Sequence, residues 1–306
     1  MLARPGLPSF DYVRASSVDE VLSWLHEARG AARLMMGGTD LFVRLRDGDV
    51  SARIVVDLKH LPGMRDIAYD DAGGLTIGAA ATMNDVARHP DVQAHYPILA
   101  ESASSVASYQ LRNRATIGGN LCNGSPAADT APSVLVLGGT MVLRGPPNAR
   151  VPGPGSQRTV PAERFFLGPG QTAMQPGEFM TAVHFPVPPS RAAGRYLKLG
   201  RNKAGDLAIA GVAVLGFADE VAPSGHRFRI ALASVAAVPM RALAAEETLA
   251  SEPPGEQTFA KAADEAREAA SPIDDVRASA AYRRAMVRNL TLRGLRDVWG
   301  QIGEGR

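Results

Sequence analysis

Helix-like and strand-like patterns alternate over the first 60 residues of the chain. Ser17 and Glu20 have the spacing of a capping box, and apolar residues then fall on one helical face over 18–28. Short apolar runs at 33–36 and 54–58 predict two buried strands, and a pair of glycines ends the first of them. This region is therefore predicted to be a small α/β unit whose strands stand on either side of a glycine loop.

The pattern changes after this first unit. A strand is predicted over 75–79, and a helix is predicted to begin at Thr82. A second helix is expected over 98–107, and an apolar, strand-like segment over 134–143, in which Gly138-Gly139 would form a bulge or a turn. The stretch 146–154 is rich in proline and glycine and is predicted to be a surface loop.

A proline-rich break at 186–190 separates the last part of the chain from the rest. Polar turns divide three predicted strands beyond it, at 196–200, 207–218 and 228–237. This succession is typical of an antiparallel meander. Two helices are predicted to follow, over 259–270 and 279–299.

The length of the chain supports a two-domain arrangement, because 306 residues correspond to roughly two domains of about 150 residues each. We predict an α+β protein. The first domain spans 1–185, with a small parallel-sheet lobe over about 1–60 and a mixed or antiparallel β lobe over about 61–185. The second domain spans 190–306 and combines a three-stranded antiparallel sheet with helices.

Composition limits the chemistry that this chain can carry alone. Its single cysteine, Cys122, excludes an intramolecular disulfide, an all-cysteine zinc site and an iron–sulfur cluster held by this chain alone. The six histidines lie far apart without metal-ligand spacing, so no metal site is predicted. The common P-loop, zinc-protease, hydrolase and dinucleotide signatures are absent, and no catalytic residue is predicted. Redox chemistry would therefore need a bound organic cofactor or a partner subunit.

Charge and hydropathy predict a cytoplasmic protein. The net charge is +2 and the lysines and arginines are scattered, which gives no electrostatic footprint for nucleic acid. The N-terminus has no apolar signal region. The longest apolar run, 207–218, has twelve residues, too few for the ~20 that span a bilayer. Neither a nucleic-acid partner nor a transmembrane segment is predicted.

The first of two glycine-rich segments, 36–41, follows a predicted strand directly. Its consecutive glycines let backbone N–H groups approach an anion closely, and Thr39 adds a hydroxyl donor. The alternative interpretation is a tight turn that ends the strand, with Asp40 or Thr39 as a helix cap.

The second glycine-rich segment, 112–132, combines small residues, amides and hydroxyls with almost no bulky apolar residue. A loop of this length without core residues is typical of a binding loop. The pair Gly118-Gly119 permits close backbone approach, and Asp129 could accept from sugar hydroxyls. Directed hydrogen bonds are available from Thr116, Asn120 and Asn123. The alternative is a glycine-rich hairpin.

These two segments carry a family resemblance. The motif G-G-T-D-L, followed by A-T-I-G-G-N-L-C-N-x-S-P-A-A-D-T-A-P, resembles the FAD-binding (medium) subunit of the molybdenum hydroxylases. That family includes the medium subunit of carbon monoxide dehydrogenase and the flavin domain of xanthine dehydrogenase. Four further elements of the chain are similar to family motifs, at 165–170, 176–180, 198–208 and 275–283. The resemblance therefore runs over nearly the whole chain.

The resemblance implies a two-lobed FAD-binding domain followed by the C-terminal domain of a flavin subunit. It implies noncovalent FAD on this chain, with a molybdenum–pterin cofactor on a large partner and 2Fe–2S clusters on a small partner. Electrons would pass from those clusters through FAD to an external acceptor such as a quinone, a cytochrome or oxygen. The assembly would be a dimer of heterotrimers. Two alternatives are a self-contained flavin oxidase or dehydrogenase of the related fold, and a non-redox binder of nucleotides or phosphate.

The resemblance also implies roles for individual residues. The FAD pyrophosphate would be wrapped by Arg33, Leu34, Met35, Met36, Gly37, Gly38, Thr39, Asp40 and Leu41. The pyrophosphate and the isoalloxazine would be flanked by Ala115, Thr116, Gly119, Asn120, Cys122 and Asn123. Asp129 would bind ribityl or ribose hydroxyls, Phe179 and Met180 would line the adenine or ring pocket, and Lys198 would lie near the polar edge of the flavin. Cys122 is expected to be an unreactive thiol against a ring face.

Two features distinguish the chain from parts of that family. Relatives that reduce aromatic-CoA thioesters carry a cysteine-rich insertion for a 4Fe–4S cluster, and this chain has a single cysteine. NAD-dependent members have a mobile charged loop after the lysine element, whereas 202–205 is short here. Neither a 4Fe–4S cluster nor a nicotinamide site is therefore expected.

Overall fold

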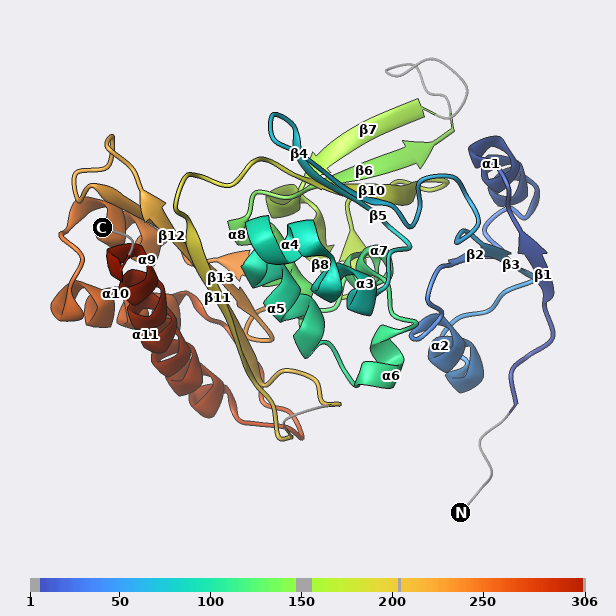
Figure 1. Cartoon of the computed structure of the whole chain (residues 1–306). Helices are drawn as coiled ribbons and strands as arrows, with labels where there is room; N and C mark the ends of the chain where they lie inside the picture. Colours follow the sequence, from blue (N-terminus) through green and yellow to red (C-terminus); the bar gives the residue numbers. More distant parts are fainter. Residues whose placement is uncertain (1–5, 147–155, 203–204, 305–306) are drawn as a thin grey trace.

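The computed structural model describes residues 6–146, 156–202 and 205–304, with side chains as far as 302. Three groups of elements follow one another along the molecule in Figure 1: a small N-terminal unit, a central group of strands and helices, and a C-terminal sheet with its helices. Most of the predicted surface loop at 146–154 lies outside the described residues. None of the helices in the described part of the chain is long and apolar enough to cross a membrane.

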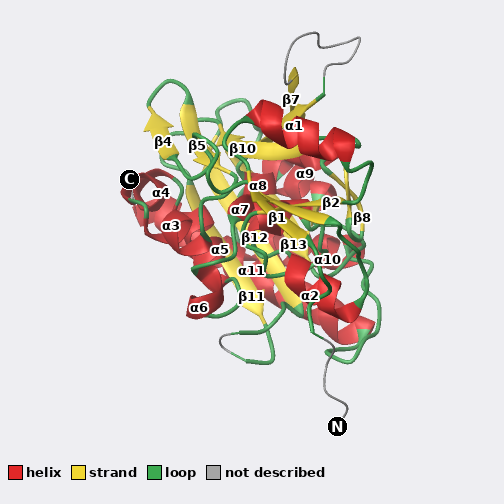
Figure 2. Ribbon diagram, turned by 90° about the vertical axis from the view of Figure 1, so that its right-hand side faces the viewer, coloured by secondary structure: helices red, strands yellow, loops and turns green. Residues whose placement is uncertain are grey.

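The N-terminal unit is a three-stranded parallel sheet in the order β1-β3-β2. Its elements are β1 (Asp11–Arg14), α1 (Val18–Glu27), β2 (Ala32–Met35), α2 (Leu41–Asp47) and β3 (Ile54–Asp57). Figures 1 and 2 show α1 and α2 on opposite sides of this sheet. Val55 packs with Leu45 of α2, while Val56 packs in the core that holds Val21 of α1. Because both faces of β3 are covered, its sequence is continuously apolar rather than alternating.

The central group contains a five-stranded antiparallel sheet in the order β4-β5-β10-β6-β7. Its strands are β4 (Ile67–Asp70), β5 (Gly74–Gly78), β6 (Thr140–Gly145), β7 (Ser156–Pro161) and β10 (Phe179–Phe185), and a small separate pair is β8 (Phe166–Gly168) with β9 (Gln171–Thr172). The helices are α3 (Met83–Arg88), α4 (Pro90–His95), α5 (Pro97–Ser105), α6 (Tyr109–Arg112), α7 (Ile117–Cys122) and α8 (Thr130–Val136). The helix start at Thr82 is confirmed, because Thr82 and Asp85 form a reciprocal capping box.

Two expectations for this region are wrong. The segment 134–143 is not one strand, because Thr130–Val136 forms α8 and β6 begins at Thr140. The turn expected at Gly138-Gly139 does lie between these two elements. All seven residues of α8 are buried, so its apolar run shows no periodicity that separates helix from strand. The second glycine-rich segment is not a loop without core residues either. It contains the short helix α7, whose Ile117 and Leu121 are fully buried.

The C-terminal sheet is antiparallel in the order β11-β12-β13-β14. Its elements are β11 (Ala193–Leu199), β12 (Ala210–Ala218), β13 (His226–Ala233), β14 (Met240–Arg241), α9 (Leu243–Ser251), α10 (Glu256–Ala269) and α11 (Ala280–Glu304). The three predicted strands are present, but the short strand β14 and the helix α9 were not predicted.

Both faces of the C-terminal sheet are covered, which explains the longest apolar run of the sequence. Helix α11 packs on one face of β12, and α8 of the central group packs on the other. Accordingly Val212 and Val214 belong to the C-terminal core, while Ala213 and Leu215 belong to the core of the central group. The C-terminal sheet therefore stands directly behind the segment that follows α7.

Candidate functional site

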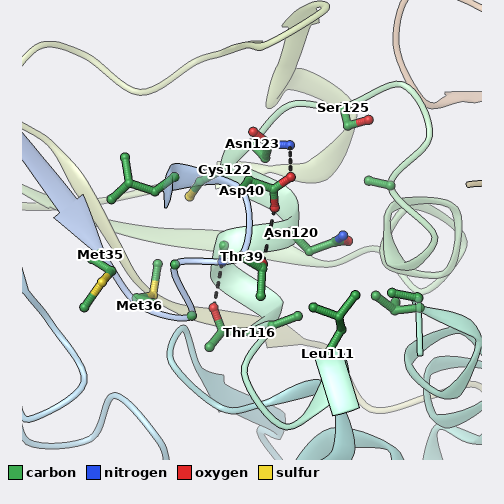
Figure 3. A pocket seen from close by; sticks show the side chains of 18 of the residues that line it. Met35, Met36, Thr39, Asp40, Leu111, Thr116, Asn120, Cys122, Asn123 and Ser125 are labelled. Carbon is green, nitrogen blue, oxygen red and sulfur yellow. Dashed lines mark hydrogen bonds between the residues drawn. The ribbon is translucent and has the colours of Figure 1, made fainter. Parts of the chain in front are cut away.

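A cavity of about 560 Å³ lies between the N-terminal unit and the central group. Both glycine-rich segments line it, and Figure 3 shows their side chains around the same space. The cavity brings together all of 33–41, the six residues predicted from 115–123, and Asp129, Phe179 and Met180. Among the predicted site residues, Lys198 is the exception, because it lines a neighbouring cavity instead.

The first glycine-rich segment connects the carboxyl end of β2 to α2 and offers free backbone donors. Within the described residues, no acceptor is found for the backbone N–H groups of Gly37, Gly38 and Thr39. Asp40 stands at the N-cap position of α2, but its side chain makes no capping hydrogen bond. A run of unpaired N–H groups that faces a cavity is an anion-binding arrangement. This geometry favours the anion-site interpretation over the helix-cap alternative.

The two glycine-rich segments touch each other at Gly37. A Cβ atom placed on Gly37 would lie 2.2 Å from the carbonyl oxygen of Arg114, so a side chain has no room there. A second link joins Asn123 to Asp40, with the Asn123 Nδ2 atom 3.4 Å from Asp40 Oδ1 (Figure 3). The two segments are about 75 residues apart in sequence, and together they form one wall of the cavity.

The glycine pair of the second segment differs from the expectation. Gly118 is buried against the chain itself, because a Cβ atom placed on it would lie 2.6 Å from Ala79 Cβ. Its N–H group donates to the Ala79 carbonyl at 2.9 Å. Gly119 does line the cavity, and its N–H group donates to Thr116 Oγ1 at 3.1 Å. The backbone donors of this pair are thus used to form and anchor α7 rather than left free for a ligand.

Among the described residues, Asn120 has an unpaired amide N–H group at the cavity. Its Oδ1 atom accepts from Thr130 Oγ1 at 2.6 Å, which fixes the orientation of the amide. No acceptor for the Asn120 Nδ2 group is found within the described residues. The side chain therefore offers N–H donors into the cavity that it lines.

Asp129 lies at the inner wall of the cavity and is paired from behind. Its carboxylate accepts from Tyr196 Oη and from Lys198 Nζ, each at 2.8 Å. The Lys198 ammonium also donates to the Ser105 carbonyl at 3.0 Å. Burial raises the pKa of Asp129, and the neighbouring Lys198 charge opposes that rise. The positive charge of Lys198 is therefore directed at Asp129 and not into the cavity.

Cys122 has the properties of an unreactive thiol. Its Sγ atom lies 3.8 Å from Met174 Sδ, and burial raises the pKa of the thiol to about 12. The thiolate, which is the reactive form, is therefore scarce at neutral pH.

Several residues that line the cavity were not among the predicted site residues. They are Arg44, Leu58, Val106, Ala107, Leu111, Ser125, Ala127, Ala128, Met174, Glu178, Gly205, Asp206 and Leu207. Ser125, Ala127 and Ala128 belong to the second glycine-rich segment, whose composition could have included them. The motifs at 176–180 and 198–208 contain Glu178, Gly205, Asp206 and Leu207. The remaining residues come from elements that only the tertiary fold brings to the cavity.

The neighbouring cavity, of about 460 Å³, shares Gly205 and Asp206 with the first. The short segment 202–205 follows β11 at its edge, and residues 203–204 of that segment lie outside the described residues. The expectation that no nicotinamide site is present here stays a prediction.

The larger cavity fits a phosphate-bearing aromatic cofactor. Unpaired N–H groups are suited to phosphate oxygens, and a carboxylate is suited to sugar hydroxyls. The apolar side chains of Met36, Leu111 and Phe179 are suited to the faces of a ring. This site, set between a small parallel-sheet unit and an antiparallel sheet, defines a nucleotide-cofactor-binding protein.

Comparison with known proteins gives the family. Residues 8–188 match the model of the FAD binding domain in molybdopterin dehydrogenase, and residues 195–298 match the CO dehydrogenase flavoprotein C-terminal domain. The chain therefore belongs to the family of FAD-binding subunits of molybdopterin-dependent dehydrogenases, and it is an oxidoreductase subunit whose cofactor is FAD. The resemblance seen in the sequence is confirmed, and so is the α+β fold class.

Individual relatives match almost end to end. The carbon monoxide dehydrogenase medium chain of Hydrogenophaga pseudoflava is 33% identical over 96% of this chain and 98% of its own length. The xanthine dehydrogenase FAD-binding subunit of Escherichia coli is 29% identical over 95% of this chain and 97% of its own. The solved structure of carbon monoxide dehydrogenase from H. pseudoflava superposes with a TM-score of 0.88 at 32% identity, covering 96% of this chain and 98% of the other.

Proposed function

We propose that this chain is the electron-transfer subunit of a three-part molybdenum hydroxylase. Electrons taken from an organic substrate at a molybdenum–pterin centre on a large partner would reach 2Fe–2S clusters on a small partner. FAD bound on this chain would supply the redox chemistry that links those clusters to an external acceptor. The observation that carries the proposal is the single cavity formed by both glycine-rich segments, within a chain that matches flavin subunits along its length.

The residues of this chain would bind and orient the cofactor and would not break substrate bonds. The free N–H groups of 37–39 would hold the pyrophosphate, and Asn120 would donate to its oxygens or to the ring. Asp129 would accept from ribityl or ribose hydroxyls. Phe179 and Met180, which are buried at the start of β10, would pack against the adenine or the ring. Lys198 would act through Asp129, because its ammonium is paired with that carboxylate.

We keep three further predictions as part of this proposal. Residues 1–185 would form the FAD-binding domain, with lobes over about 1–60 and 61–185, and residues 190–306 would form the C-terminal domain. The assembly would be a dimer of heterotrimers. The compartment would be the cytoplasm. The separate sheets of the three regions support the first of these predictions.

Purification of the tagged chain from its native cells tests the proposal. The expected result is co-purification of one larger and one smaller chain, with molybdenum and iron in the complex and flavin on this chain. A chain that purifies with its flavin but without metal-bearing partners, and whose flavin is reduced by an organic substrate, would instead be a self-contained flavin oxidase or dehydrogenase. A chain without visible flavin absorbance would contradict both functions.

A further inference from the structure

Two residues of strand β11 contact the larger cavity only indirectly, through Asp129. Tyr196 and Lys198 stand two positions apart on β11, so their side chains point to the same face of the sheet. Both donate to Asp129, one to each carboxylate oxygen. Asp129 lines the larger cavity, whereas Tyr196 and Lys198 do not. The carboxylate thus stands between the cavity and two donors from the C-terminal sheet.

The Tyr196 hydroxyl occupies a space that the neighbouring strand leaves open. A Cβ atom placed on Gly211 of β12 would lie 2.7 Å from Tyr196 Oη, closer than a side chain tolerates. The Tyr196 side chain is itself buried, with 3% of its surface exposed. Its backbone N–H donates to Glu101 Oε2 at 2.8 Å, which anchors the strand to α5 at this point. The phenol is therefore buried in a space that requires glycine at 211, and its hydroxyl donates to Asp129 there.

Electrostatics keep the Tyr196 hydroxyl as the donor and the Asp129 carboxylate as the acceptor of this hydrogen bond. Burial raises the pKa of Tyr196 well above its usual value, and the Asp129 charge raises it further, so the phenol stays a donor. The charged and titratable groups that face the pair are Lys198 on β11 and Glu101 on α5. Both donors approach Asp129 from the sheet side. The remaining lone pairs of the carboxylate are available on the cavity side.

We propose that Tyr196 is a positioning residue for the cofactor: its hydroxyl holds the Asp129 carboxylate in the orientation that accepts hydrogen bonds from the polyhydroxyl chain of the flavin. This inference rests on the proposed function, since it requires FAD in the larger cavity. By this inference, the C-terminal sheet contributes to cofactor binding although Tyr196 does not line the cavity.

The test compares two buried tyrosines whose hydroxyl groups each donate a hydrogen bond. Tyr196→Phe removes the donor to Asp129. Tyr96→Phe removes a hydrogen bond of 3.0 Å to the Pro186 carbonyl, and Tyr96 is 1% exposed and lines neither cavity. The full-length chain, freed of flavin, is titrated with FAD across a range of pH, and flavin fluorescence reports binding. Thermal unfolding of each variant without FAD is measured in parallel.

We expect Tyr196→Phe to weaken FAD binding about tenfold, because the cofactor must then order a carboxylate that the phenol no longer holds. Because a donor to Asp129 is lost, its protonation shifts to higher pH, and the acid limit of FAD binding shifts upward with it. Tyr96→Phe is expected to lower thermal stability and to leave both FAD affinity and its pH profile unchanged. If Tyr196→Phe does not fold, Gly211→Ala displaces the hydroxyl while keeping the phenol, and the same loss of affinity is expected.

Three other results would overturn the inference. Unchanged FAD affinity and pH profile in Tyr196→Phe would exclude the positioning role while leaving the proposed function intact. Equal weakening in both tyrosine variants would show a general effect of stability. A wild-type chain that binds no FAD would remove the inference together with the proposed function.

Discussion

Replacement of Gly37 by alanine tests whether the two glycine-rich segments form one cofactor site. The added Cβ would lie 2.2 Å from the Arg114 carbonyl oxygen, which is 1.2 Å short of the 3.4 Å at which ordinary contact begins. Ala115 Cα would lie 3.2 Å away, so the contact is with backbone and no flexible side chain can move aside. The segments must therefore separate by about 1 Å. Overpacking strain of about 1–3 kcal/mol that falls on the cofactor site corresponds to about ten- to a hundredfold in affinity.

We expect Gly37→Ala to raise the dissociation constant of FAD by about ten- to a hundredfold, measured by fluorescence titration of the flavin-free chain. Strain from overpacking is expected to lower the free energy of unfolding by about 1–3 kcal/mol. The matched control is Gly300→Ala in α11, where an added Cβ meets nothing within 4 Å. A folded Gly37→Ala protein that binds FAD as tightly as the wild type would refute the conclusion that contact between the segments shapes the site.

Three further predictions concern stability and the cysteine. Arg283 is 2% exposed and donates to Asp275 and to two backbone carbonyls. In urea titrations, Arg283→Met should lower the free energy of unfolding by about 3 kcal/mol, against less than about 1 kcal/mol for the exposed Arg293→Met. The hydrogen bond from Arg201 lowers the pKa of Asp206 to about 2, and the backbone N–H of Arg277 lowers the pKa of Asp275 further. The stability that these two carboxylates contribute is complete above their unfolded pKa near 4 and is lost as the pH falls through their folded pKa values. The melting temperature should therefore fall between about pH 4 and pH 2, and it should fall less steeply in Asp275→Asn. Equal dependence of the melting temperature on pH in the two proteins would contradict this. Cys122 should react with iodoacetamide at neutral pH about a thousandfold more slowly than a free thiol, because burial raises its pKa to about 12 and leaves little thiolate. Rapid alkylation of the folded chain would contradict this prediction.

Local chemistry explains which parts of the site the sequence could predict. The caps at Ser17 and Thr82 depend on neighbouring residues alone, and the structure confirms them. The two glycine-rich segments stand out in the sequence for the same reason, since glycine, amide and hydroxyl residues gather in short stretches. Such features need no knowledge of what packs against them.

The parts that sequence patterns missed depend on packing between distant segments. Gly118 looks like its neighbour Gly119, yet it faces Ala79 because β5 ends beside α7. Helix α8 is covered on all sides, so burial removed the periodicity that marks a helix. The charge of Lys198 is directed at Asp129 because β11 stands behind that residue, and no spacing along the chain encodes this arrangement.

Identification of the flavin released from the natively purified chain tests the central claim most directly. Acid precipitation frees a noncovalently bound cofactor, and its adenine half can then be identified by mass. The account predicts about one FAD per chain in the supernatant, because the cavity offers donors for a pyrophosphate as well as apolar walls for a ring. Release of no flavin, or of a flavin without its adenylate half, would contradict it.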